Sequence, residues 1–79
     1  MSLRPSVRAE LSAHGIAAGA DESPSALRER LNDLYLEEVR ALKARQRSGE
    51  IPLGEYAAHV EALKRRFPLL GVPIGAWLE

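Results

Sequence analysis

A single glycine, Gly49, separates two long stretches of sequence that both have the periodicity of amphipathic helices. From Pro24 to Arg47 no residue interrupts a helix, and Ala, Leu, Arg, Glu and Lys dominate this stretch. Glycine is typical of a helix end because it adopts left-handed backbone without steric cost. The sequence therefore predicts an antiparallel hairpin with helices over about 24–48 and about 53–66.

Local signals also mark the outer ends of this hairpin. Ser23 supplies a side-chain oxygen that can cap free helix amides, and Pro24 is favoured as a first helical residue. Pro68 disfavours helical geometry at Phe67, so the second helix should end there. The apolar residues of the second helix fall at helical spacing on one stripe, namely Tyr56, Val60, Leu63 and Phe67.

Two shorter segments flank the hairpin. A first helix over about 5–14 is indicated by Pro5 at its start and by Gly15 after its last periodic residue. The tail over 68–79 is apolar, with two prolines and two glycines, so we expect an extended segment that packs on this chain or on a partner. The predicted fold class is all-α, with one three-helix domain spanning residues 1–79.

Composition argues against several classes of function. The chain has no cysteine, so it forms neither a disulfide, nor a thiolate metal site, nor a cysteine nucleophile, and we expect a cytoplasmic protein. Eleven basic and eleven acidic residues balance, whereas DNA-coating proteins carry a clear positive excess. No apolar run approaches the roughly 20 residues of a membrane span. His14 and His59 lack the spacing of a metal site. We therefore expect no enzyme, metal or cofactor.

Residues 36–66 resemble the short helical hairpins of the SHOCT family. The matching positions lie on both helices and the turn, and they are Leu42, Gly49, Ile51, Glu55, Tyr56, Leu63 and Lys64. The chain departs from the family at Pro52, where the family usually has a capping threonine. The resemblance implies a small interaction or oligomerisation module and says little about activity.

Residues 7–31 resemble the SAP-like helix-extension-helix of DNA-binding proteins more faintly. The shared positions are Leu11, Gly15, Ile16, Leu27, Arg30 and Leu31. The loop is longer than in that family and lacks its lysine, and any two helices joined by a Gly-Ile turn give the same letters. A nucleic-acid accessory role would use Arg28, Arg30 and the basic run over 40–47.

Glu38 lies near the middle of the apolar arc of the long helix, where a carboxylate is unfavourable unless it is paired. In an antiparallel hairpin it would face residues 60–64, so Lys64 or Arg65 could reach it. The structural explanations are a salt bridge that sets the hairpin register, or a groove edge that no third layer covers. The functional explanation is a buried acid tuned for catalysis or binding. We favour a structural role.

Leu36 and Trp77 are the candidate interface residues. Leu36 lies on the charged face of the long helix, although a single exposed leucine is ordinary. Tryptophan is enriched at binding hot spots, but for Trp77 we favour packing against the hairpin, because a core of 79 residues needs its apolar area. The predicted function is a non-enzymatic interaction or oligomerisation module, with a second copy or another protein as partner. Nucleic-acid binding is the alternative.

Overall fold

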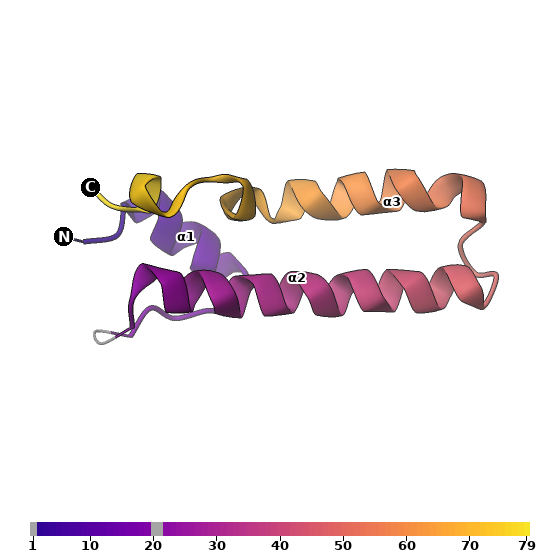
Figure 1. Ribbon diagram of the computed structural model, residues 1–79, viewed down its shortest axis with the longest axis horizontal. Helices are drawn as coiled ribbons and strands as arrows, with labels where there is room; N and C mark the ends of the chain where they lie inside the picture. Colours follow the sequence, from indigo (N-terminus) through magenta and orange to yellow (C-terminus); the bar gives the residue numbers. More distant parts are fainter. Residues whose placement is uncertain (1, 20–21) are drawn as a thin grey trace.

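The computed structural model describes residues 2–19 and 22–79, and the secondary structure of this part is helical apart from one isolated bridge (Figure 1). Its elements follow the chain in the order α1 (Pro5–Ala13), α2 (Pro24–Arg47), α3 (Leu53–Arg66), η1 (Pro68–Gly71) and η2 (Ile74–Trp77), where η marks a 3-10 helix. The predicted fold class and the three predicted helices are confirmed, with bounds that differ by at most one residue.

The predicted end signals act as expected. The Ser23 hydroxyl accepts a hydrogen bond from the Ala26 amide at 3.1 Å, which caps α2. Gly49 has a φ of 85°, the left-handed conformation that reverses the chain between α2 and α3. Beyond it, the Ile51 amide donates to the Arg45 carbonyl at 3.2 Å, and the Ile51 side chain is buried under the turn.

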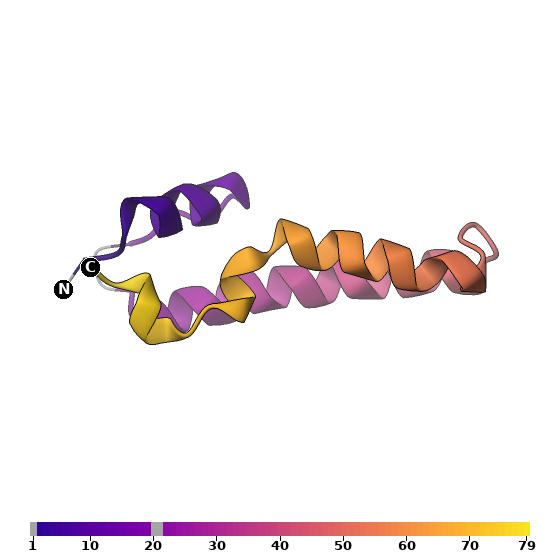
Figure 2. The same cartoon turned by 90° about the horizontal axis from the view of Figure 1, so that it is seen from above.

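The tail is not extended, so that part of the prediction is wrong. It folds into η1 and η2, and both pack against α2 (Figure 2). Proline fixes φ near the value of a 3-10 turn, and Pro68 and Pro73 stand at the starts of the two turns. Burial of Leu69 and Trp77 then holds both turns against the rest of the chain. The sequence left open whether the tail packs on its own chain or on a partner. In the structure it packs on its own chain.

The core lies at the open end of the hairpin, and we call this end the root. The root comprises α1 with the residues on either side of it, residues 24–35 of α2, residues 63–67, and the tail. Its buried members come from every one of these elements: Leu3, Val7, Leu11, Ile16, Leu27, Leu31, Leu63, Phe67, Leu69 and Trp77. Trp77 is fully buried, and its indole Nε1 donates to the Val72 carbonyl at 3.2 Å. The large aromatic is therefore a central packing element with its polar atom satisfied.

Both ends of α1 are tied to the rest of the root. Before α1, an isolated antiparallel bridge joins Leu3 to Leu78, and the Arg4 amide donates to the Trp77 carbonyl at 2.9 Å. After α1, the His14 ring stacks on Phe67 with centroids 4.3 Å apart. The His14 Nε2 lies 2.6 Å from the Arg66 carbonyl, to which it donates. These contacts position a nine-residue helix that would be too short to persist alone.

The other half of the hairpin, residues 36–62, extends away from the root as two helices and a turn, and we call it the arm. Neither α1 nor the tail reaches along it, as Figures 1 and 2 both show. Ile51 is the single buried residue of the arm. The molecule accordingly measures 47 × 18 × 17 Å, with a radius of gyration of 14.7 Å. No helix of the described residues is long and apolar enough to cross a membrane.

Candidate functional site

The two candidate interface residues have opposite environments. Leu36 is 40% exposed on α2, so the prediction that it faces solvent is confirmed. Trp77 has no exposed surface, so the favoured prediction that it packs within the chain is confirmed, and its candidate assignment to an interface is wrong. A small domain needs the apolar area of its largest side chain for its own core, and the root uses it there. Leu36 therefore stays a candidate contact residue, and Trp77 does not.

Glu38 is exposed, and no polar or charged side chain is buried in the described part of the chain. The prediction of a buried Glu38 paired with Lys64 or Arg65 is therefore wrong. Glu38 lines a shallow hollow of about 200 Å³ between α2 and α3, which is the groove edge that no third layer covers. The other residues of this hollow are Leu42, Arg45, His59, Ala62, Leu63 and Arg66.

Helix geometry explains why the two predicted partners do not face Glu38. Leu63 is buried in the core, and each following residue is rotated by about 100° around the helix axis. Lys64 and Arg65 consequently point away from the α3 face that lines the hollow. Lys64 instead lies 3.5 Å from Glu61 on its own helix, where both side chains are exposed.

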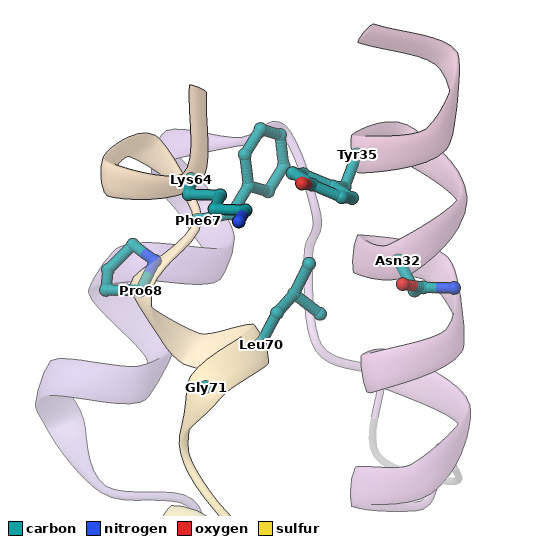
Figure 3. Close-up of a pocket in the computed structure, with 7 residues that line it drawn as sticks. All are labelled: Asn32, Tyr35, Lys64, Phe67, Pro68, Leu70 and Gly71. Atoms are coloured by element: carbon teal, nitrogen blue, oxygen red, sulfur yellow. The ribbon is translucent and has the colours of Figure 1, made fainter. Parts of the chain in front are cut away.

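A second hollow, of about 330 Å³, opens between α2 and the start of the tail (Figure 3). It is lined by Asn32, Tyr35, Lys64, Phe67, Pro68, Leu70 and Gly71. Figure 3 shows Tyr35 and Leu70 entering it from opposite sides, and the Tyr35 ring meets the edge of Phe67 with centroids 5.5 Å apart. Most of its lining residues are apolar, so this surface offers mainly apolar contact.

Three arginines that nucleic-acid binding would use are engaged within the chain. Arg28 donates to the Leu70 carbonyl at 3.0 Å, which ties the tail to α2. Arg30 reaches both carboxylate oxygens of Glu22 at 2.8 Å, and Arg45 pairs with Glu50 at 2.8 Å beside the hairpin turn. The hydrogen bond from Arg30, helped by the Gly19 amide, lowers the pKa of the Glu22 carboxyl below its ordinary value.

The side of α2 that points away from the core is exposed to solvent, and it is bordered at Asp33 by a hollow that His14, Gly15 and Ile16 also line. Its residues repeat at alternating steps of four and three, which places them on one side of a helix: Glu29, Asp33, Leu36, Arg40, Lys43 and Arg47. We call these six residues the outer face of α2. All six are exposed, and its five charged members form no ion pair within the described part of the chain.

Charge on the outer face of α2 is divided by sign. The acidic residues Glu29 and Asp33 lie on its first half, and Arg40, Lys43 and Arg47 lie on its second half. Like charges therefore meet at four-residue spacing, as in Glu29 with Asp33, and each such pair destabilises a lone helix by about 0.2–0.5 kcal/mol. The sequence prediction considered only the basic run. The acidic half would have emerged from following the same spacing back toward residue 29.

The described residues contain no group of three or more His, Cys, Asp or Glu side chains arranged to hold a metal ion. Comparisons of the chain with protein-family models, with curated proteins and with solved structures give no match. The SHOCT-like and SAP-like resemblances therefore stay predictions, and function has to be argued from the surfaces described above.

Proposed function

We propose that this chain is a small, non-enzymatic protein-interaction module that associates with a second copy of itself. The observation that carries the proposal is the uncovered hairpin. Half of a 24-residue helix and most of α3 form an arm that no other element of the described chain covers.

The shape of the molecule gives the size of this uncovered surface. The radius of gyration is 14.7 Å, whereas a compact chain of 79 residues has about 11.6 Å. The accessible surface is 5325 Å², about 600 Å² more than a compact protein of 8.7 kDa exposes. One partner of a standard interface buries about 800 Å², so the excess is of the size that an association can use.

The side chains of the arm support the same proposal. Val39, Leu42, Tyr56 and Val60 line the seam between α2 and α3, and all four are only partly buried. Leu36 and Leu53 add exposed apolar surface, with 40% and 74% of their areas accessible. A two-helix layer leaves apolar side chains open to water along its seam, and it also leaves the outer side of each helix free for a partner that packs along the arm.

Sedimentation equilibrium of the full chain, from micromolar to about millimolar concentration, tests the proposal. We expect an average mass that rises above 8.7 kDa with concentration and approaches that of a dimer. A mass that stays at 8.7 kDa throughout would remove self-association from the proposal. The cysteine-free composition makes the cytoplasm the proposed location.

Nucleic-acid binding is the second candidate, and one observation favours it. Arg40, Lys43 and Arg47 lie on one side of α2, are exposed and pair with no carboxylate of the described chain. Such a stripe could follow a phosphate backbone, although Arg28 and Arg30 are engaged elsewhere. Fluorescence anisotropy of labelled duplex DNA at low and moderate salt tests this candidate. Charge-driven contacts are strongest at low salt, so no binding there would end it.

A further inference from the structure

We infer that two copies of the chain pair through the outer faces of their α2 helices, antiparallel, around a two-fold axis level with residue 38. This inference rests on the proposed self-association and specifies its surface. It is argued from the sign, spacing and exposure of the six residues of the outer face of α2.

Antiparallel pairing brings every acidic residue of this face opposite a basic residue of the second copy. Glu29 lies level with Arg47 of the second copy, and Asp33 lies level with Lys43 of the second copy. Because a two-fold axis repeats each contact, two different pairs give four opposite-charge contacts. Complementary charge of this kind selects the partner and fixes the register of a helix pair.

The same charges oppose the parallel arrangement. In parallel helices the acidic half of one copy would lie beside the acidic half of the other, and the basic halves would also meet. Each half of the face, which places like charges four residues apart within one helix, therefore meets opposite charge only beside an antiparallel neighbour. The opposite signs that only the antiparallel orientation brings together are the main argument for this surface.

Leu36 is the apolar residue of the outer face, and its position agrees with the same axis. It lies two residues from the level of the axis, so the two copies of Leu36 stand about 6 Å apart along the helix direction. Each copy of Leu36 is level with Arg40 of the other chain, whose methylene stem can cover it while the guanidinium stays in water. The exposed leucine thus obtains an apolar contact at the centre of the pair.

The contact is narrow, which sets its expected strength. The face runs from residue 29 to residue 47, which is about 27 Å of helix. A pair of helices of this length buries a total accessible surface below about 1,200 Å², the range of weak interfaces. Mostly exposed ion pairs also weaken as salt shortens the Debye length. We therefore expect a weak dimer that dissociates further when salt rises from about 0.02 M to about 0.5 M.

Charge reversal tests the pairing in the full chain, with sedimentation velocity as the measurement. Asp33→Lys alone and Lys43→Glu alone each replace two attractive contacts with two repulsive ones, so each should weaken dimerisation about tenfold or more. The double variant Asp33→Lys/Lys43→Glu should restore it to within a few-fold. An equimolar mixture of the two single variants should form heterodimers. Arg65→Glu on the exposed side of α3 has the same charge change as Lys43→Glu and should leave dimerisation unchanged.

Loss of dimerisation in the single variants can be distinguished from misfolding. Each single variant replaces like charges at four-residue spacing with opposite charges, so the helix of the isolated chain should become slightly more stable, and thermal unfolding by circular dichroism checks this. If the natural chain dimerises but neither salt nor the single variants change it, the pairing through α2 is overturned while self-association stands. Failure of the double variant to restore dimerisation also overturns it. A natural chain that stays monomeric at low salt removes the proposed self-association itself.

Discussion

The root and the arm contain the same α2 helix in two different environments. In the root, Leu27 and Leu31 are buried by α1, α3 and the tail, with at most 1% of their areas exposed. In the arm, Val39 and Leu42 continue the same apolar stripe and pack at the edge of the core, but both stay partly exposed. Helices in proteins gain most of their stability from such packing, so the two halves of α2 should differ in stability although their sequences are equally helical. Four predictions test this difference.

Trp77→Ala should give the largest effect, because it removes the largest fully buried side chain of the root. Truncating a buried tryptophan costs about 3–5 kcal/mol, which is a large part of the stability of a small domain. Urea unfolding followed by circular dichroism measures the loss. Leu53→Ala on the arm is the control, since Leu53 is 74% exposed and its change should stay within about 0.5 kcal/mol. Equal losses in the free energy of unfolding of the two variants would contradict the expectation that the root contributes most of the stability.

Leu31→Ala and Leu42→Ala compare the same substitution in root and arm. Leu31 has no exposed surface, so its truncation should cost about 2–5 kcal/mol. Leu42 is partly exposed and lines an open hollow, so its truncation should cost about 1 kcal/mol. Free energies of unfolding from chemical denaturation give both values. A loss at Leu42 as large as that at Leu31 would mean that the arm is packed as well as the root.

Gly49→Ala and Gly54→Ala test the tip of the arm and should act in opposite directions. Gly49 has a positive φ, so a side chain there should cost about 1–2 kcal/mol. Gly54 lies within α3 with open space around it, so alanine should stabilise the helix by up to about 1 kcal/mol. Thermal unfolding of the two variants checks the signs. Stabilisation by Gly49→Ala would mean that the turn does not need left-handed backbone.

The smallest expected effect is a pH dependence located beside the root. Arg30 holds the pKa of Glu22 below the ordinary value of 4.5, so this carboxylate favours the folded state above that value. The contribution is lost as pH falls below 4.5 and through the lowered pKa of the folded state. The natural chain should therefore be slightly more stable than Glu22→Gln at neutral pH, and the difference should vanish in acid. Unfolding of both chains at several pH values measures it, and a difference that persists in acid would contradict it.

The elements of the fold were predictable from sequence because their ends depend on neighbouring residues. Ser23 with Pro24 starts α2, Gly49 reverses the chain, and Phe67 before Pro68 ends α3, each through backbone geometry that operates locally. The conformation of the tail was not predictable in this way. Its two 3-10 turns depend on burial of side chains against α2, which is a contact between distant parts of the chain.

The environment of individual side chains was harder to predict than the helices. Glu38 lies on the apolar arc of α2, and periodicity alone cannot tell that its part of the arc has no third layer above it. His14 was expected at the end of a helix, yet its contacts with Phe67 and Arg66, distant in sequence, dock α1 onto α3. The outer face of α2, by contrast, depends only on spacing and charge, so it could have been predicted from the sequence.

The bridge between the two ends of the chain has a mechanical consequence. Ser2 and Glu79 lie next to each other, where the Glu79 amide donates to the Ser2 carbonyl at 3.0 Å, with the Arg4–Trp77 hydrogen bond directly behind. Tension applied between the two ends would load these bonds one after another, as in a zipper, rather than all together in shear. Under such a force the root would open first and the arm last. The half of the molecule with the greatest thermodynamic stability would then be the first to yield to a pull.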